Sequence, residues 1–459
     1  MALAPKIVKV REGLEKKPFE RGDHVELADR LVTILRSESS TVFADGQVWR
    51  YDHGTHIFKI LEPAELSQIV QGFAGLQVRS GKKLRDLRLK AADVGGAIRL
   101  AQDQLSDVQF FANAPRGIVF ENGFVRITGE QTTVDAHSAD HRARFAYPFA
   151  FEPKSFPARF CEFLSQIFEG DHDRADKVKL IQEFVGVSMI GCATIYQTGV
   201  IEVGDGSNGK GVLNQIVEAA MPPGSVCAIP PQDFGQEYRR AMLAGKLINI
   251  VSEVPEADIL DTESFKSVIS GDSTTGREIR QAPFTFKPVA GHLMATNRLP
   301  CTQDQTHGFW RRWALLTYNR VFLPHEQNKY LAAELIRDEL PAIVAWFLAG
   351  AQRALLLGAL TIPESHQAAL DKWKQRADQI LAFVDEKCER LPADAEQYQW
   401  TPASNVYNRY RTWANDNGHR PVASNTFGER MRLIGLPSKH TMTGKLYPVA
   451  MQASGGDHD

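Results

Sequence analysis

The chain has 459 residues, a formal net charge of −2, and 43% hydrophobic against 24% charged residues, which predicts two to four domains with buried cores. The near-neutral charge excludes a protein that coats polyanions over its whole surface, so DNA binding would need local basic patches. The 5 cysteines are scattered, which excludes a disulfide framework or a cysteine zinc site and fits a reducing cytoplasm.

Residues 1–157 predict an N-terminal domain of mixed, largely helical character. Residues 25–37 have helical periodicity, and residues 42–51 read as a strand. Residues 79–90 form a basic run, for which we favour a solvated helix face or a subunit contact over a DNA-facing collar. The N-terminus does not resemble a signal peptide, and no apolar run approaches the length of a membrane span, so we expect no membrane contact.

Residues 158–325 predict the catalytic core of the chain. Residues 158–195 read as helices, and residues 196–322 alternate apolar strands with helices, as a nucleotide-binding α/β domain does. The run Gly199–Val203 suits a buried strand, and a helix is expected to follow from Val212.

A phosphate-binding loop joins that strand to that helix. The pattern Gly-x4-Gly-Lys offers backbone N–H groups to phosphates and a lysine to the β and γ oxygens, so it predicts ATP binding. A serine or threonine that would bind Mg²⁺ usually follows the lysine, but a glycine stands there. The predicted nucleotide-binding residues are Gly204, Asp205, Gly206, Ser207, Asn208, Gly209, Lys210, Gly211 and Val212.

Two later strands end in polar residues that suit hydrolysis. The strand 247–253 ends in Glu253, whose carboxylate is predicted to hold hydrated Mg²⁺ and to polarise the attacking water. The strand 292–297 ends in Asn297, whose amide can orient that water or sense the γ-phosphate. Arg311 and Arg312 then lie between two tryptophans, and such a fixed guanidinium pair suits an arginine finger that acts on another subunit.

The C-terminal part divides at a linker. Residues 326–392 predict a helical extension of the core, with a long helical stretch over 331–360 broken at Gly350 and Gly358, and a helix over 365–390. Residues 391–396 read as the linker, and residues 451–459 as a disordered tail.

Residues 393–450 predict a separate small module. Their pattern is helix, helix, hairpin, with Phe427, Met431 and Leu433 facing inward. Basic side chains predicted to face outward would contact DNA phosphates, which gives a salt-sensitive affinity independent of base sequence. The alternative is a helical cap kept soluble by its arginines. The predicted DNA contacts here are Arg430, Arg432, Lys439 and Lys445.

The order of these motifs resembles the superfamily 3 (AAA+) helicases, in particular the helicase part of phage and plasmid primase–helicase proteins. The resemblance is carried by GDGSNGKG at 204–211, LINIVSE at 247–253, FKSVISGD at 265–272, LMATNRLP at 293–300 and GFWRRWALLTYNRVF at 308–322. It extends over roughly residues 25–390, where 42–51 resembles that family's helical N-terminal region.

The resemblance implies a multidomain α/β fold with a helical N-terminal collar, an AAA+ ATPase core and a C-terminal winged-helix-like module. It implies an ATP- and Mg²⁺-dependent helicase that acts on single-stranded and forked DNA, as a hexameric ring, in a bacterial host. Lys210, Glu253 and Asn297 would act from one chain and Arg312, with Arg311 beside it, from the next. Residues 271–287 would form a DNA-gripping hairpin, and the predicted DNA contacts in and near it are Lys266, Arg277, Arg280 and Lys287.

One missing segment and two departures from the family pattern refine this expectation. Only about 25 residues precede the resemblance, so we expect a separate primase rather than a fused one. Gly211 and the single acid Glu253 favour an alternative in which the protein is a nucleotide-regulated replication initiator that binds DNA with little motor activity. A P-loop phosphotransferase for a small molecule is a third hypothesis, which the arginine pair and the basic C-terminal module oppose.

Overall fold

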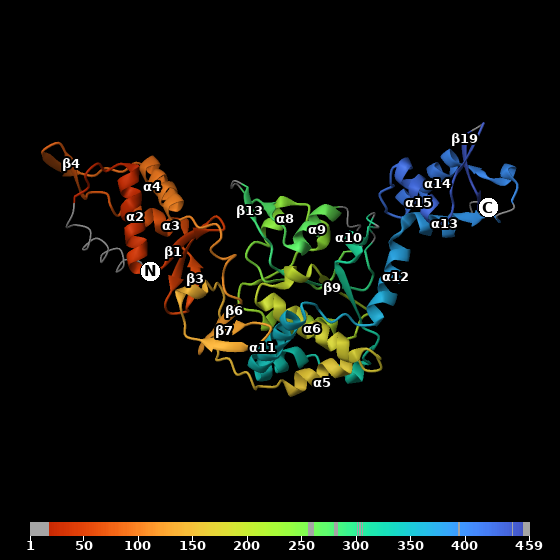
Figure 1. Ribbon diagram of the computed structural model, residues 1–459, viewed down its shortest axis with the longest axis horizontal. Helices are drawn as coiled ribbons and strands as arrows, with labels where there is room; N and C mark the ends of the chain where they lie inside the picture. The colour runs from red at the N-terminus through yellow and green to blue at the C-terminus, as the bar shows by residue number, and fades with distance from the viewer. Residues whose placement is uncertain are drawn as a thin grey trace.

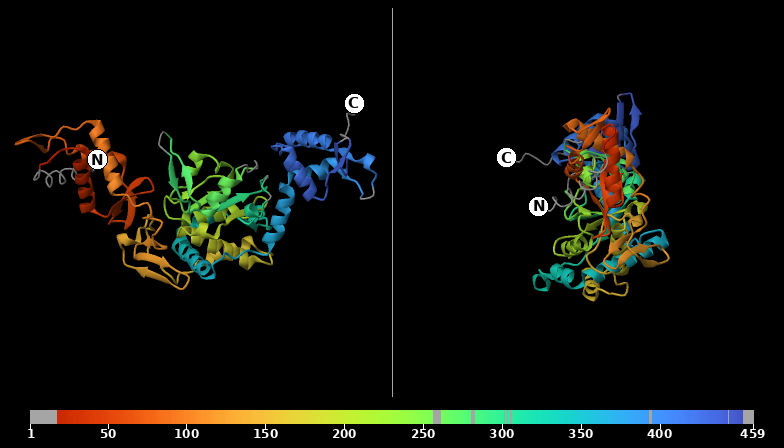
Figure 2. Two further views of the ribbon diagram at one scale, coloured as in Figure 1. Left: turned by 45° about the horizontal axis from the view of Figure 1, so that its top comes forward. Right: turned by 90° about the vertical axis from the view of Figure 1, so that its left-hand side faces the viewer.

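The structure is a computed structural model that describes residues 18–255, 261–279, 283–300, 302, 304, 306–392, 395–442 and 444–452. Figure 1 shows three parts along the long axis of the molecule: an N-terminal part at one end, a central core, and a C-terminal module at the other end. Helix α12 leads from the core to the C-terminal module, and Figure 2 shows the same separation from another direction.

The N-terminal part has its own apolar core, built by three helices. Leu27, Leu31 and Leu35 repeat on one face of the first helix and are buried against the other two. The helices are α2 (His24–Glu38), α3 (Pro63–Gln71) and α4 (Ala91–Gln104). The predicted helix over 25–37 is therefore confirmed.

Two sequence predictions in this part are wrong in detail. Residues 42–51 form a hairpin rather than one strand or a helical region, because Asp45 and Gly46 both take positive φ (51° and 75°) and reverse the chain. The basic run also forms an exposed hairpin instead of a helix. The strands concerned are β1 (Thr41–Ala44), β2 (Gln47–Asp52), β3 (Ile57–Ile60), β4 (Gln77–Ser80) and β5 (Lys83–Asp86).

A second small sheet joins the N-terminal region to the core. Its apolar residues Ile118, Phe120 and Val125 belong to the same buried cluster as the core helices. The region 1–157 is thus split, since this sheet packs with the core rather than with the three helices. The strands are β6 (Gly117–Phe120), β7 (Gly123–Ile127) and β8 (Thr132–Asp135).

The core is built on a five-stranded sheet in which every neighbouring pair is parallel. The strand order is β10-β11-β14-β9-β15, so that β14 lies between β9 and β11. All five carboxyl ends therefore meet at one edge, where open α/β sheets bind ligands. The strands are β9 (Gly199–Val203), β10 (Val226–Cys227), β11 (Ile248–Val251), β14 (Gly291–Thr296) and β15 (Trp313–Thr317).

Helices cover both faces of this sheet. Alternate residues of β9 show the two layers: Val200 packs into the cluster of α5, α6, α7 and α11, whereas Ile201 packs into the cluster of α9, α10 and α12. The predicted alternation of strands and helices over 196–322 is confirmed. The core helices are α5 (Ala158–Ile167), α6 (Arg174–Met189), α7 (Lys210–Ala220), α8 (Glu237–Ala241), α9 (Thr262–Ser270), α10 (His307–Trp310), α11 (Leu331–Leu357) and α12 (Ser365–Ala377).

Helix α11 runs through the core without the predicted break at Gly350. A Cβ at Gly350 would lie 2.3 Å from the carbonyl oxygen of Gln182, so glycine serves close packing against α6 there. Gly358, with φ of 66°, ends the helix as predicted. By length and composition, α11 could span a membrane, contrary to the sequence expectation; it is the one such helix in the described residues, and it packs in the core with α5, α6 and α7.

The C-terminal module begins earlier than the predicted boundary at residue 393. The stretch 365–390 is two helices separated at Asp378, and the second packs with the module through Phe383 and Val384. The predicted order of helix, helix and hairpin is confirmed, but Leu433 is 60% exposed rather than inward-facing. The elements are α13 (Gln379–Lys387), β16 (Cys388–Arg390), β17 (Thr401–Pro402), α14 (Ala403–Asp416), α15 (Ser424–Leu433), β18 (Lys439–Thr441), β19 (Gly444–Tyr447) and β20 (Val449–Met451). The tail 453–459 lies outside the described residues.

Candidate functional site

The predicted phosphate-binding loop joins β9 to α7 at the carboxyl edge of the sheet. Its backbone takes positive φ at Ser207 (60°) and Gly209 (90°). At Gly209 only glycine fits, because a Cβ would lie 2.5 Å from Cγ2 of Ile167. Buried Asn208 closes the loop by donating to the Asp205 carbonyl and accepting from the Lys210 N–H at 3.3 Å. The loop is thus held in shape by its own side chain and by α5.

Lys210 is the first residue of α7 and turns back into the loop. Its side chain is buried, and its ammonium donates to the Gly204 carbonyl and, at 3.4 Å, to Oδ1 of Asn297. Burial lowers its pKa, while the nearby Glu202 and Asp205 oppose that shift. These partners are neutral oxygens, which a phosphate can replace with a stronger charge-assisted bond.

Glu253 and Asn297 meet the loop in one cavity. Because β11 and β14 are adjacent and parallel, the residues that follow them reach the same edge of the sheet. Asp205, Gly206, Glu253 and Asn297 line a cavity of about 440 Å³ there, which suits a small ligand. Three of the predicted functions, carried by the loop, the acid and the amide, are therefore brought together.

Three residues of this site were missed by the sequence reasoning. Thr296 and Arg298 line the same cavity on either side of Asn297. The third, Glu202, lies in β9 directly below the loop and is fully buried. An acid inside the apolar run Gly199–Val203 was the signal that could have drawn attention to it.

Glu202 forms a buried polar cluster with Tyr318 and Lys210. The Tyr318 hydroxyl donates to the Glu202 carboxylate, and the Lys210 ammonium lies 5.9 Å from the centre of the Tyr318 ring. Burial raises the pKa of Glu202 to about 7, against the opposing effects of Tyr318, Asn214 and Lys210. The carboxyl group thus titrates near neutral pH, next to the residue predicted to bind phosphate.

Two carboxylates, those of Asp205 and Glu253, line the cavity where a divalent cation would bind. Among the described residues no group of three or more His, Cys, Asp or Glu side chains could hold a metal. Glu253 is exposed in the cavity, and Mg²⁺ that is bound mainly by phosphate oxygens and water needs no more protein ligands than this. A Cβ at Gly211 would meet nothing within 4 Å, so the missing hydroxyl is not excluded by space.

The arginine pair, Arg311 and Arg312, lies at the amino ends of the strands, whereas the phosphate loop lies at their carboxyl ends. Trp313 pairs with Gly199 at the start of β9, and Thr317 with Val203 at its end. About five residues at ~3.3 Å each, roughly 16 Å, therefore separate Arg311 and Arg312 from their own phosphate loop. Neither can serve the site of its own chain by a side-chain movement alone.

The two arginines differ in what they contact. Arg312 is buried, and its guanidinium donates to the hydroxyl of Ser270 (2.8 and 3.1 Å) and to the Gly308 carbonyl. Burial and the adjacent Arg311 lower the pKa of Arg312. Arg311 is exposed and donates to the Gln197 amide at 2.9 Å. Of the two arginines, Arg311 is therefore the one whose guanidinium is accessible from outside the chain.

The structure contains the predicted hairpin within residues 271–287, but the basic residues in and near it differ in exposure and in their partners. Strands β12 (Thr274–Gly276) and β13 (Phe284–Phe286) are antiparallel, and Lys287 is exposed beside them. Arg277 is half-buried, with its guanidinium 6.0 Å from the Tyr238 ring, and Arg280 lies outside the described residues. The Lys266 ammonium forms ion pairs with Asp304 at 2.6 Å and Glu263 at 3.0 Å, so its charge is already balanced within the chain.

In the C-terminal module, one of the four predicted DNA contacts has a structural role. Arg430 forms an ion pair with the buried Asp378, which caps the start of α13, and so ties α15 to α13. Because of this ion pair, the prediction that Arg430 points outward is wrong. Arg432, Lys439 and Lys445 are exposed.

Comparisons with known proteins match two segments of the chain. Residues 203–312 match a family of unknown function, DUF5906, and residues 375–445 match a family described as Poxvirus D5 protein-like. No curated protein sequence matches the chain.

Among solved structures, two apo forms of the NrS-1 C-terminal region resemble the chain. Each has 11% sequence identity and a TM-score of 0.45. One covers 92% of this chain and 98% of its own, and the other, of residues 305–718, covers 93% and 100%.

Proposed function

We propose that the protein is an ATP-dependent DNA helicase or translocase that acts in the replication of a phage or mobile genetic element. The observation that carries this proposal is the convergence of the phosphate loop, Glu253 and Asn297 on one cavity. Proteins that hydrolyse nucleoside triphosphates need these three functions: a phosphate cradle, a carboxylate for metal and water, and a polar group that orients the water. The match of residues 375–445 to the Poxvirus D5 protein-like family supports a place in viral replication, among proteins of the primase–helicase type.

In this mechanism the residues have separate tasks. ATP would supply the phosphoanhydride bond, and Mg²⁺ would supply positive charge that neutralises the phosphates. The Lys210 ammonium exchanges the Gly204 carbonyl for phosphate oxygens, and the loop N–H groups hold the remaining phosphates. Glu253 accepts a proton from the attacking water, and Asn297 fixes the position of that water by hydrogen bonding. Because these side chains project from a rigid sheet edge, the water is positioned before the reaction.

We propose that the catalytic site is completed by a second subunit. The arginines lie about 16 Å from their own loop, so a finger arginine can act only on a neighbouring chain. An exposed guanidinium such as that of Arg311 would stabilise the charge on the transferred phosphoryl group. A closed ring, which we propose to be hexameric, repeats this interface around single-stranded or forked DNA. A separate primase is a proposed partner.

The test of the proposal is ATP hydrolysis with and without single-stranded DNA. We expect DNA to stimulate turnover in the wild type and Lys210→Ala to abolish it, with unchanged thermal unfolding as the control for folding. Strand displacement on a forked duplex should then depend on ATP. Turnover that persists in the Lys210→Ala protein would contradict the assignment of the site.

The alternative, a nucleotide-regulated initiator, is favoured by two features: Gly211 gives Mg²⁺ no hydroxyl, and Glu253 is a single acid where two could stand. Because space is open at Gly211, Gly211→Ser tests the first feature directly, with Gly211→Ala as a control that changes helix propensity but adds no hydroxyl. We expect the serine variant alone to raise ATP turnover, by roughly tenfold if the hydroxyl contributes ~1.4 kcal/mol to the transition state. ATP binding without turnover in all three proteins would support the initiator.

A further inference from the structure

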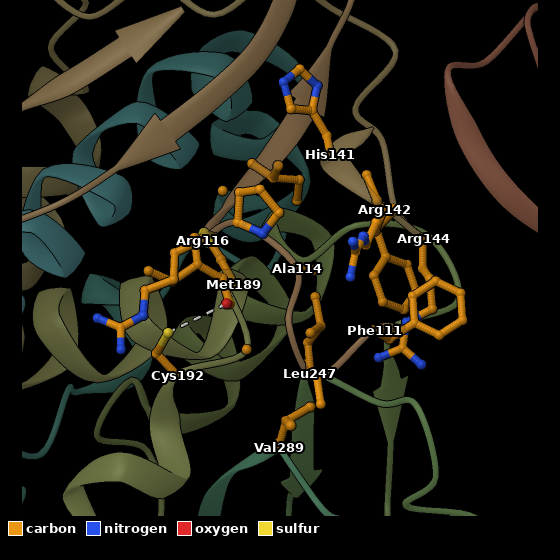
Figure 3. A pocket seen from close by; sticks show the side chains of 18 of the residues that line it. Phe111, Ala114, Arg116, His141, Arg142, Arg144, Met189, Cys192, Leu247 and Val289 are labelled. Carbon is orange, nitrogen blue, oxygen red and sulfur yellow. Dashed lines mark hydrogen bonds between the residues drawn. The ribbon is translucent and has the colours of Figure 1, made fainter. Parts of the chain in front are cut away.

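Two cavities adjoin where the N-terminal part meets the core. The first has a volume of about 280 Å³ and is shown in Figure 3. The second, of about 570 Å³, lies between the β1–β2 hairpin and the β12–β13 hairpin. Arg144, Phe145 and Val289 line both, so the two cavities are neighbours, and together we call them the junction trough.

The first cavity carries unbalanced positive charge. Arg116, Arg142 and Arg144 line it, and no described lining residue is an acid. Arg144 is balanced by Asp45 at 3.0 Å. Arg142 donates to the Phe110 carbonyl at 3.0 Å, which supplies no countercharge, and within the described residues Arg116 is exposed with no ion-pair partner. Arginines without a carboxylate partner favour an anionic ligand.

The arginines lie on two sides of the cavity, and aromatic side chains lie beside Arg142 and Arg144. In Figure 3, Arg116 lies on one side, and Arg142, Arg144 and Phe111 lie on the other. The guanidinium of Arg144 lies 4.6 Å from the Phe111 ring and that of Arg142 lies 4.8 Å from the Phe110 ring. These contacts fix the guanidinium planes, so that their N–H groups are oriented before a ligand arrives.

Backbone strain is present at the same wall. Arg142 has a φ of 51°, in the left-handed region that favours glycine and asparagine. It follows the short 3₁₀ helix Ala139–His141, whose end it caps. A long cationic side chain held in an unfavourable backbone conformation next to a cavity is typical of a functional position.

The second cavity extends this chemistry toward the β12–β13 hairpin. Lys246 and Lys287 line it, together with the aromatic residues Trp49, Phe284 and Phe286. Two acids also line it, Asp45, which pairs with Arg144, and Glu278. Basic residues interleaved with aromatic rings along a groove bind single-stranded nucleic acid, by phosphate contacts and base stacking.

We propose that the junction trough binds a single strand of nucleic acid, with its phosphates at Arg116 and Arg142 and its bases toward the aromatic residues. The linings of the two neighbouring cavities reach from Arg116 to the β12–β13 hairpin, and this extent favours a strand over a small anion. The choice of DNA as the ligand rests on the proposed function, but binding here requires no ATP turnover. The strand would therefore contact the N-terminal part and the hairpin at the same time.

The experiment measures binding of fluorescein-labelled oligo-dT by anisotropy over a range of salt concentrations. Arg116→Glu is the main variant, because Arg116 is exposed and its replacement should leave folding intact. Arg99→Glu, an exposed arginine on α4 outside the trough, is the matched control. Arg142→Ala, checked by thermal unfolding, is the second variant. ATP hydrolysis is measured for each protein with and without single-stranded DNA.

We expect Arg116→Glu to weaken binding by about tenfold and to reduce the salt slope by about 1, whereas Arg99→Glu changes neither. Unchanged affinity in both trough variants, with wild-type binding intact, would overturn the proposal and leave the proposed function standing. Weakened binding with no ATP turnover in any protein would support the trough and overturn the motor. Competition by inorganic phosphate as effective as by unlabelled oligo-dT would overturn the strand in favour of a small anion.

Discussion

At the scale of single residues, the site contains three side chains whose positions the sequence pattern predicts and a buried acid, Glu202, whose role it does not. Lys210, Glu253 and Asn297 each follow a strand end, so their convergence could be predicted from the parallel sheet. Glu202 could not be assigned a role, because its partner Tyr318 lies 116 residues away, beyond the end of β15. The same limit applies to Arg312: its burial against Ser270 depends on tertiary packing and not on the local sequence.

The buried Glu202 predicts a pH-dependent stability. Burial raises its pKa from 4.5 to about 7, so between these values the folded protein holds a proton that the unfolded chain releases. The free energy of unfolding is therefore highest below about pH 4.5, and it falls by up to ~3 kcal/mol as the pH rises through 7. The groups that face Glu202 are Tyr318, Asn214 and Lys210.

Glu202→Gln removes the titrating group while keeping the shape of the side chain. We expect the variant to lose this part of the decline in stability between pH 5 and pH 8, measured by urea denaturation at each pH. Tyr318→Phe removes the hydroxyl that donates to the carboxylate and serves as a second variant: it should make ionisation of Glu202 harder and the decline steeper. A Glu202→Gln protein with the same pH profile as the wild type would count against the raised pKa.

At the scale of elements, strands and helices with a clear apolar pattern could be predicted from the sequence. Elements whose conformation depends on contacts with distant segments could not. The apolar runs that became β9, β11 and β14 end in glycine or polar residues and were predicted as strands, whereas β10 and β15 of the same sheet were not. The basic run 79–90 gave no apolar periodicity, and its hairpin depends on pairing of β4 with β5. The glycine of α11 was read as a break because the sequence does not show that another helix lies against it.

At the crossing of α6 and α11, we expect even the small side chain of alanine to lower the free energy of unfolding. A Cβ at Gly350 would lie 2.3 Å from the Gln182 carbonyl oxygen, and one at Gly186 would lie 2.0 Å from that of Phe347. Gly350→Ala must push the two helices apart, so we expect a loss of roughly 1–3 kcal/mol, seen as a lower Tm in thermal unfolding. Gly211→Ala, on α7 in the same core with open space around it, should be neutral or stabilising. Equal Tm changes in the two variants would show that the crossing is not close-packed.

At the scale of the whole molecule, the three parts have different relations to the site. The loop, Glu253 and Asn297 lie within the central core, whereas the C-terminal module is reached through α12 at the far end of the molecule. The module's exposed Arg432, Lys439 and Lys445 are therefore placed to contact a partner independently of the nucleotide. The arginine pair lies in the core, at the end of the sheet opposite the phosphate loop, so in the proposed ring it would act on the next chain.

This separation predicts that activity can be restored by mixing two inactive proteins. Lys210→Ala inactivates the site of its own chain, and Arg311→Ala inactivates the site of a neighbour. In a mixed ring, some interfaces pair an intact loop with an intact arginine, so ATP turnover should recover after subunit exchange is confirmed by fluorescence energy transfer. Arg312→Ala is the matched comparison: because its guanidinium donates to Ser270 and Gly308 within its own chain, we expect it to lower Tm. Recovery with Arg312→Ala but not with Arg311→Ala would return the role of finger to Arg312, and no recovery with either would contradict a shared site.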